Sequence, residues 1–374
     1  MDYLAGRKKK KRPAGRLERF KEDKARREQQ APPGERKGPI AGRCPFFCPV
    51  EEERQRSAMK DLHVFERRND GTPGTVIKKY SRSAADATFL PEAIRPLNVL
   101  RQTAAFLWAE IFPRSPTSPL DALRTASFDD IYPFIRDRTR AIRQDVVVQD
   151  LTSPAVAQLI APMARFHILA MHRLRGRPLA VFDPKMNLEQ LRNCMATVLA
   201  LDPPLSMRAE FHAYALLLAM DDAARQWAWH AADGGVRATA VFAQAHAAAE
   251  AVQRGDWVTF FRIRQQAPPL VAVVMGEHAE AVRERALGVL NSGFMGTYPL
   301  AELAKQLGLD DVAQACAWTD ACGLPVDDDG ESVVLKKVAI REAPRDFVAG
   351  RAASAWLTAK LDAAEDILGT AREP

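Results

Sequence analysis

The sequence lacks the paired cysteines of a disulfide-stabilised protein. Its 374 residues include five cysteines, an odd number spread widely along the chain: Cys44, Cys48, Cys194, Cys316 and Cys322. A chain of this length with 47% hydrophobic residues can bury a sizeable core without cross-links. The cysteine pattern therefore fits a reducing compartment, the cytosol or the nucleus, and argues against secretion.

Long apolar runs are also missing. We find no stretch that approaches the roughly 18 apolar residues of a membrane-spanning helix. The amino terminus carries a basic cluster, Lys8, Lys9, Lys10, Lys11 and Arg12, with no hydrophobic segment behind it, unlike a signal peptide. These absences predict a protein that has no membrane partner.

Signatures of catalysis are absent as well. The seven histidines are scattered, and none forms the H-x-x-x-H or H-E-x-x-H pairs that bind zinc on a helix. Asp233-Gly234-Gly235 lacks the Lys-Ser or Lys-Thr that follows a phosphate-binding loop, so we interpret it as a turn. The sequence predicts no enzyme, no catalytic residues, no cofactor and no small-molecule substrate.

Cys44 and Cys48 form the one motif that suggests a metal or a redox pair. Their C-x-x-x-C spacing has no second Cys or His pair nearby, since the next histidine is His63. We therefore predict no metal site. We interpret the aromatic-flanked segment Cys44 to Pro49 as a rigid piece that docks on the rest of the chain, and a metal knuckle is the weaker alternative.

The charge of the chain is concentrated in its first residues. Residues 1–43 carry 15 Lys and Arg against 6 Asp and Glu, a net charge of +9, whereas residues 44–374 carry 38 against 41. Residues 1–43 also lack apolar periodicity, which predicts a disordered basic tail. The cluster Lys8 to Arg12 has the form of a nuclear localisation signal, and a tail that only aids solubility is the alternative.

Helical periodicity dominates from about residue 92. Leu188, Leu191, Met195 and Val198 are spaced by threes and fours behind Asn187, which predicts a helix over 187–201 with Asn187 as its N-cap. Similar stripes follow in the next segments, with alanine on more than one face. We predict an all-α fold in which residues 92–283 form an irregular array of stacked helical hairpins, with no fixed repeat period. Residues 44–91 are predicted to be an extended entrance segment packed on this array.

The segment 284–341 changes character. Two short helices around Leu300–Leu307 and Val312–Thr319 precede two apolar runs, Leu324–Val326 and Val333–Leu335, which an Asp-Gly turn joins. This order predicts a C-terminal winged helix with a small β-hairpin. Residues 342–374 are predicted to form a closing helix, from Phe347 to Leu368.

One internal stretch carries a row of arginines. If residues 131–146 are helical, the side chains of Ile131, Ile135, Ile142 and Val146 share one face, and those of Arg136, Arg140 and Arg143 line another at i, i+4 and i+7. Arginines in such a row can bind phosphates or acidic side chains. The alternative is a solvated face, or one paired internally with Asp137 and Asp145.

The predicted winged helix offers a second basic site. Its second helix holds no Lys or Arg, which argues against reading of DNA bases. Lys336 and Lys337, beyond the hairpin, are candidates for contact with a nucleic-acid backbone. Packing against protein is the favoured use of this domain.

Several motifs occur in one order along the chain: Gly42-x-Cys44-x-x-x-Cys48-Pro49, Leu62-x-Val64-Phe65-Glu66, Lys78-Lys79-Tyr80-Ser81-Arg82, Ile94-Arg95-Pro96-Leu97, Asp137-Arg138-Thr139-Arg140-Ala141-Ile142-Arg143-Gln144-Asp145, Arg165-Phe166-His167, Glu189-Gln190-Leu191 and Glu210-Phe211-x-x-Tyr214. Together they resemble the Sac-three/GANP family over nearly all of residues 42–368. The entrance departs from the family pattern, because Phe47 stands where Met is usual and Glu52-Glu53-Arg54 replaces or shifts a Glu-Arg pair.

The resemblance implies a PCI-like fold and a role as a hub. Family members bind a second PCI-type protein and a small acidic Sem/DSS-type peptide, and paired winged helices present basic surface to RNA or DNA. The resemblance thus implies a non-enzymatic scaffold subunit of an mRNA nuclear export or transcription-coupled complex, located in the nucleus. The alternative is a factor for centrosome duplication, spindle assembly and mitotic progression that acts through protein contacts, because in length the chain looks like the short, centrosome-associated members. A cytoplasmic location is open as well.

Overall fold

The structure is a computed structural model of the chain. It describes residues 38–81, 90–112, 121–219, 224–337, 340–343, 354–364 and 366–370. The chain divides into two units, Met1–Ile40 and Ala41–Pro374, and the second holds every element described below. The basic cluster Lys8 to Arg12 lies outside the described residues.

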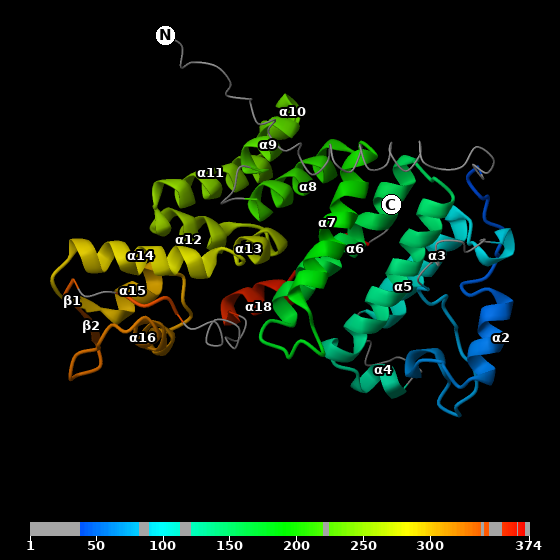
Figure 1. The fold of residues 1–374 in the computed structure, drawn as a ribbon, viewed down its shortest axis with the longest axis horizontal. Coiled ribbons are helices and arrows are strands. Elements are labelled where there is room, and N and C mark those ends of the chain that lie inside the picture. The colour runs from blue at the N-terminus through cyan, green and yellow to red at the C-terminus, as the bar shows by residue number, and fades with distance from the viewer. Residues whose placement is uncertain are drawn as a thin grey trace, which may run out of the picture. The chain divides into compact units, whose positions relative to one another are not determined.

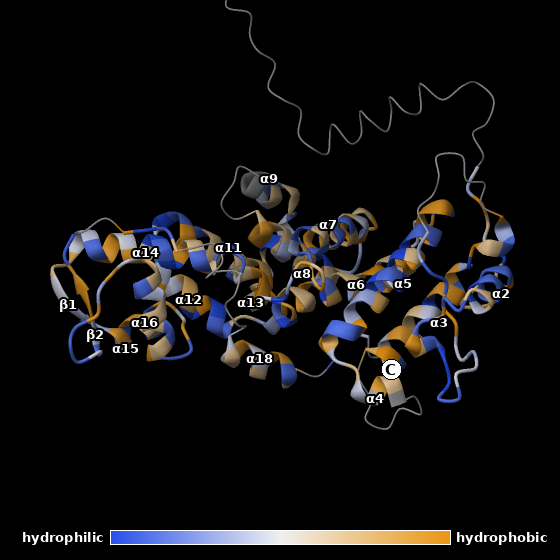
Figure 2. Cartoon of the chain, turned by 60° about the horizontal axis from the view of Figure 1, so that its bottom comes forward, coloured by the Kyte–Doolittle hydropathy of each residue, from blue (hydrophilic) through white to orange (hydrophobic). Residues whose placement is uncertain are grey.

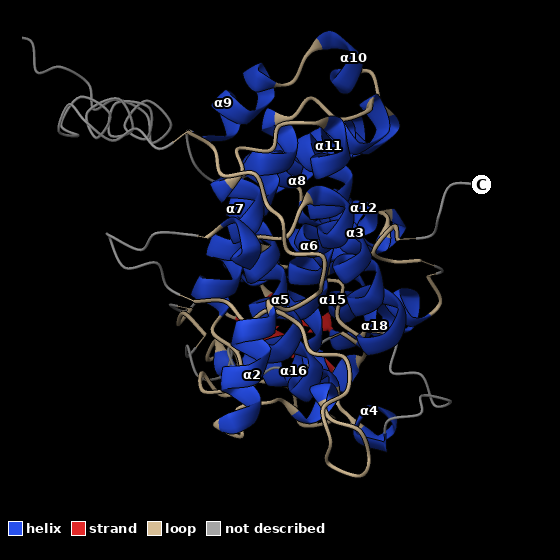
Figure 3. Cartoon of the chain, turned by 90° about the vertical axis from the view of Figure 1, so that its right-hand side faces the viewer, coloured by secondary structure: helices blue, strands red, loops and turns tan. Residues whose placement is uncertain are grey.

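Helices make up most of the second unit (Figures 1 and 3), which confirms the all-α prediction. Before residue 150 the elements are the α-helices and short helical turns α2 (Val50–Ala58), η1 (Val64–Glu66), η2 (Pro91–Ala93), α3 (Leu97–Phe106), η3 (Leu107–Ile111), α4 (Asp121–Thr125) and α5 (Phe128–Val148). The series continues with α6 (Pro154–Arg173), α7 (Pro184–Ala200), α8 (Leu205–Leu218), α9 (Ala224–Ala231), α10 (Gly234–Arg237), α11 (Ala240–Arg254), α12 (Trp257–Gln266) and α13 (Pro269–Met275).

The helices pack on one another around one main core. Contacts join α6 to α7, α8 to α11 and α11 to α12, and α13 returns to pack on both α6 and α8. Most residues of helix α6 are buried. By length and composition it could span a membrane, an exception to the absence of such runs expected from the sequence, yet 78% of its apolar window is buried among the other helices.

The prediction that Asn187 caps a helix is wrong by one turn. Helix α7 begins at Pro184, and the Asp183 side chain caps it by accepting hydrogen bonds from the Lys185 and Met186 backbone N–H groups. Proline is favoured in the first turn because its missing N–H would have no partner there. Asn187 is instead buried, where it accepts from the Tyr132 hydroxyl at 3.0 Å and lies 2.7 Å from His167 Nδ1.

The part after α13 has mixed structure. Helix α14 (Ala279–Gly293) leads into β1 (Gly296–Pro299), and α15 (Leu300–Gln306) and α16 (Val312–Ala321) precede β2 (Ser332–Leu335). Strands β1 and β2 pair antiparallel with Gly296 opposite Leu335, and Val326 makes a single bridge to Val333. The apolar run at 324–326 therefore lies beside β2 as expected, but β2 has its main partner in β1, which the sequence did not predict.

A last helix, α18 (Ala355–Asp362), returns to the helical array. Its Leu357 and Leu361 are buried, and it packs on α13. Thr358 Oγ1 lies 2.8 Å from His172 Nε2. The expected closing helix over 347–368 is thus shorter where it is described: it ends at Asp362, and Leu368 follows in a turn.

Candidate nucleic-acid interface

Helix α5 carries the predicted arginine row, and a capping box fixes its start. The Ser127 side chain accepts from the Asp130 backbone N–H, while the Asp130 carboxylate accepts from the Ser127 N–H. Ile131, Ile135, Ile142 and Val146 are buried, as the periodicity predicts. The arginines at 136, 140 and 143 are half-buried on another face of the same helix.

Each arginine of the row is held by a neutral neighbour. Arg136 lies over the Tyr132 ring, with 5.6 Å from Cζ to the ring centroid. Arg140 stacks on Tyr80 at 3.9 Å by the same measure. Arg143 donates through Nη2 to Gln190 Oε1 on α7. Aromatic and amide partners position a guanidinium while leaving its charge uncompensated.

No carboxylate among the described residues lies within 4.0 Å of these three guanidinium groups. The two acids that could have paired with the row are engaged elsewhere. Asp137 accepts from Arg138 Nη1 and from the Tyr80 backbone N–H, the latter at 3.2 Å. Asp145 is fully buried and pairs with the entrance segment. The arginines of the row therefore form no ion pair with Asp137 or Asp145.

The first buried ion cluster surrounds Asp145. Its carboxylate accepts from Lys78 Nζ at 2.7 Å and from Arg95 Nε at 2.7 Å, and the side chains of Asp145 and Arg95 are fully buried. Lys78 Nζ also donates to the Ala93 carbonyl, and Arg95 Nη1 to the Phe47 carbonyl. The cluster thereby joins three parts of residues 44–95 to one position of α5.

The second buried ion cluster surrounds Glu66. Its carboxylate pairs with Arg138 Nη2 at 3.0 Å and with Arg56 Nη2 and accepts from the Ile77 backbone N–H at 3.0 Å. Burial disfavours the charged form of Glu66, but Arg138, the Ile77 N–H and Arg56 outweigh it, so the pKa of Glu66 is lowered. Glu66 is therefore ionised at neutral pH, and it ties α2 and the entrance segment to α5.

These clusters bear directly on the arginine row. With Lys78 anchored by Asp145, the next residues run alongside α5, where Gln144 Nε2 donates to the Ser81 carbonyl at 3.0 Å. Tyr80 is thus fixed at the position where its ring faces Arg140. The buried pair of Lys78 and Asp145 therefore determines where Tyr80 lies, and through Tyr80 it positions the half-buried Arg140.

A family model for the SAC3/GANP family matches residues 47–328, three quarters of the chain. The chain belongs to this family. The resemblance inferred from the sequence motifs is thereby confirmed, and the motifs acquire a structural meaning. The two buried ion clusters bring together residues from four separate motifs of the resemblance: Glu66, Lys78, Arg95, and the pair Arg138 and Asp145.

Curated relatives are similar over most of this chain. SAC3 family protein B of Arabidopsis thaliana is 28% identical over 304 residues, 73% of this chain and 17% of that protein. Protein xmas of Drosophila melanogaster is 27% identical over 80% of this chain and 15% of its own length. SAC3 family protein 1 of Schizosaccharomyces pombe is 27% identical over 80% of this chain and 32% of its own length. The chain thus spans a third or less of these SAC3 and xmas proteins.

Lys336 and Lys337 are exposed directly after β2. They do not extend the arginine row, because β2 packs on β1 and α15, whereas α5 packs on α3, α6 and η3 (Figure 1). Helix α16, which in a DNA-reading domain would enter the groove, buries Trp318 and carries no basic residue. The two predicted basic sites are therefore separate surfaces.

The entrance cysteines are packing residues in this SAC3/GANP chain. Cys44 and Cys48 are buried, and the Cys44 backbone N–H donates to the Ile94 carbonyl at 2.9 Å. Burial raises the pKa of both thiols, which opposes the thiolate form that binds metals. Within the described residues, no group of three or more His, Cys, Asp or Glu side chains is placed to hold a metal ion.

Sequence reasoning missed the neighbours that position the row. Tyr80 and Gln190 come from segments 60 residues upstream and 50 residues downstream of Arg140, so no local spacing links them to α5. It also treated Glu66, Lys78 and Arg95 only as parts of motifs. A signal did exist for Glu66, because a carboxylate directly after Phe65 in a short apolar run must find a partner if it is buried.

Proposed function

We propose that this chain is a non-enzymatic scaffold subunit of an mRNA nuclear export or transcription-coupled complex, and that its arginine row contacts RNA. Membership of the SAC3/GANP family supports the scaffold role. One observation supports the RNA contact. Neutral groups hold Arg136, Arg140 and Arg143, and none of the three has an ion-pair partner in the described part of the chain. A guanidinium that is held in position but has no carboxylate partner is free to bind a phosphate.

We also propose protein partners for the part after α13. Its order of helix, strand, two helices and paired strand segments supports assignment as a winged helix of the PCI type. Three apolar residues near the junction of α14 and β1 are exposed, Val289 by 51%, Phe294 by 42% and Met295 by 71%. Such a patch fits a protein contact better than a nucleic-acid contact. We propose a second PCI-type protein and a small acidic Sem/DSS-type peptide as partners, with Lys336 and Lys337 as a minor contact to nucleic acid.

Charge reversal tests the RNA contact. We expect the triple variant Arg136→Glu, Arg140→Glu and Arg143→Glu to lower RNA retention by the assembled complex, most strongly at low salt. The matched control reverses three exposed arginines on other helices, Arg101, Arg254 and Arg262. Equal retention of the two variants across a salt series would reject the contact and leave a scaffold that binds only protein.

Localisation tests the cellular role. The cluster Lys8 to Arg12 supports a nuclear location, and a tagged chain should lose nuclear enrichment when the cluster is replaced by serine. Spindle-pole foci through the cell cycle, with unchanged distribution of poly(A) RNA after depletion, would instead favour the centrosomal role.

A further inference from the structure

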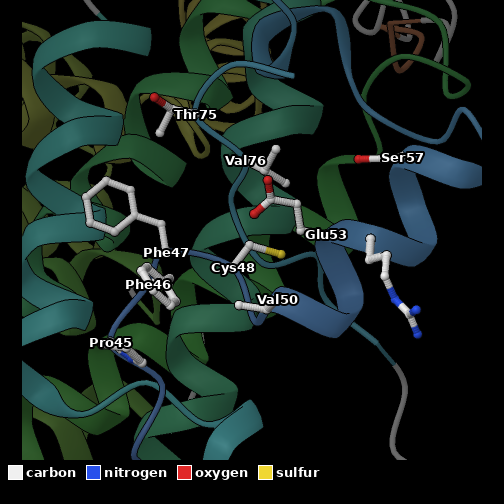
Figure 4. Close-up of a pocket in the computed structure, with 10 residues that line it drawn as sticks. Pro45, Phe46, Phe47, Cys48, Val50, Glu53, Ser57, Thr75 and Val76 are labelled. Atoms are coloured by element: carbon white, nitrogen blue, oxygen red, sulfur yellow. The ribbon is translucent and has the colours of Figure 1, made fainter. Parts of the chain in front are cut away.

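An open groove of about 690 Å³ lies beside α2, away from the arginine row. Three segments form it: the entrance residues Pro45 to Cys48, one face of α2, and the extended residues Thr75 and Val76 (Figure 4). Helix α2 contributes Val50, Glu53, Arg54 and Ser57, which recur at i, i+3, i+4 and i+7. Helix α2 is strongly hydrophilic (Figure 2). Its residues at the groove are therefore not part of an apolar face that packs on the core.

The floor of the groove is apolar and fixed, and its rim is apolar and exposed. On the floor, Cys48 and Val76 are buried, and Phe47 turns inward to pack on Phe106 with 5.8 Å between ring centroids. On the rim, Phe46 is 55% exposed and Val50 is 64% exposed. Two large apolar side chains that flank a preformed apolar floor can bury further area against a side chain of another molecule.

The charged side chains around the groove leave one carboxylate without a partner among the described residues. The Glu51 carboxylate is compensated by Arg54 at 2.8 Å, and Glu52 accepts from the Lys79 backbone N–H at 2.7 Å. The Glu53 carboxylate points along the groove toward Val76 (Figure 4) and has no hydrogen-bond or ion-pair partner among the described residues. One uncompensated negative charge therefore stands next to an apolar floor.

We infer that this groove binds a short peptide segment of a partner protein that carries a large apolar side chain followed or preceded, within four residues, by Lys or Arg. The apolar side chain fits between Phe46, Val50 and Val76, and the basic residue pairs with Glu53. Charge complementarity decides the class of occupant, because an acidic peptide or a nucleic acid would meet the unpaired carboxylate unfavourably. This surface goes beyond the proposed function, and its test does not depend on the RNA test.

A peptide scan on the full-length chain tests the inference. The probe is an array of 12-residue peptides in a Gly-Ser background, in which one Phe, Leu or Met and one Lys or Arg are placed at every spacing up to four. We expect the retained peptides to share one apolar and one basic residue. In fluorescence polarisation, Phe46→Ser and Glu53→Lys should each weaken binding of the selected peptide by about tenfold. Both side chains are at least partly exposed and have no polar partner among the described residues, so the fold should persist.

Matched variants separate the groove from general effects. Met59→Ser removes an apolar side chain that is 77% exposed just beyond α2, and Glu92→Lys reverses another exposed carboxylate, so neither should change binding. A peptide with Glu in place of its basic residue should bind Glu53→Lys better than the unchanged chain. The inference is overturned by retained peptides without the pattern, by equal binding of Phe46→Ser, or by absence of binding at millimolar peptide. A dimer that Phe46→Ser dissociates in sedimentation would overturn it too, because the occupant would be a second copy.

Discussion

The buried ion cluster at Asp145 yields a quantitative prediction. In Asp145→Asn the side chain keeps its shape but loses its charge, and the Lys78 ammonium and Arg95 guanidinium remain buried opposite it. Removal of one partner from a buried ion pair costs about 3–5 kcal/mol, because the remaining charge has neither water nor a counter-charge. The asparagine oxygen still accepts one hydrogen bond, so we expect a loss near the lower end, about 3 kcal/mol in the free energy of unfolding.

The assay is urea-induced unfolding followed by circular dichroism and tryptophan fluorescence. The control is Asp129→Asn on the same helix, which removes a partly exposed pair with Arg177 at 3.0 Å and should cost about 0–1 kcal/mol. Adding Lys78→Met to Asp145→Asn removes one unpaired cation and should recover part of the loss, a coupling of about 1–3 kcal/mol. If Asp145→Asn costs no more than Asp129→Asn, the cluster does not lock the entrance segment to α5, and the reasoning fails.

Three further predictions address the same structure. Tyr80→Ala should weaken RNA binding by about 0.5–1 kcal/mol, because the stacking that positions Arg140 is lost, while Tyr80→Phe should not, as equilibrium binding would reveal. Burial lowers the pKa of His167 to about 3 and of His172 to about 4. Below pH 6.5 these histidines therefore bind protons in the unfolded chain but not in the folded chain. As the pH falls from 6 to 4, the free energy of unfolding should fall by up to about 1.4 kcal/mol per pH unit for each histidine. His172→Gln should reduce this slope in urea titrations. Gly308 has φ +58°, and a Cβ there would lie 2.7 Å from Phe261 Cδ1, so Gly308→Ala should lower the melting temperature well beyond Gly330→Ala, where φ is +73° and the space is open.

Local periodicity predicted helices such as α5 and α8 and their buried faces. It did not predict α2, which lies within residues 44–91 that we expected to be extended, because α2 is almost entirely hydrophilic and buries only Arg56. On α5 the periodicity also contained a signal for Arg138, which lies three residues after Ile135 and four before Ile142 and hence on the apolar face. The start of α7 was misplaced because Asn187 and Asp183 are both suitable caps, and Pro184 favours Asp183. Strand β1 was missed because its sequence, Gly-Thr-Tyr-Pro, begins and ends with residues that strands disfavour and has no apolar run like that of β2.

The pairing of the charged residues could not be predicted in the same way. Asp137 and Asp145 are close in sequence to the arginine row. Asp137 pairs with the adjacent Arg138, but Tyr80, which also donates to Asp137, and the Asp145 partners Lys78 and Arg95 lie about 50 residues or more upstream. Which cation a buried carboxylate meets depends on how the entrance segment folds back on α5, a long-range event that no local spacing encodes. The sequence predicted the arginine row, but only the structure shows that its three guanidinium groups are held by neutral neighbours instead of carboxylates.

Salt dependence of RNA binding tests the arginine row most directly. The purified chain and the variant with Arg136, Arg140 and Arg143 changed to glutamine are titrated with single-stranded RNA at several salt concentrations. Each phosphate contact contributes about 0.7 to the slope of log affinity against log salt, so we expect the slope of the variant to be shallower by about 2. An unchanged slope and affinity would mean that the three guanidinium groups do not touch the RNA backbone.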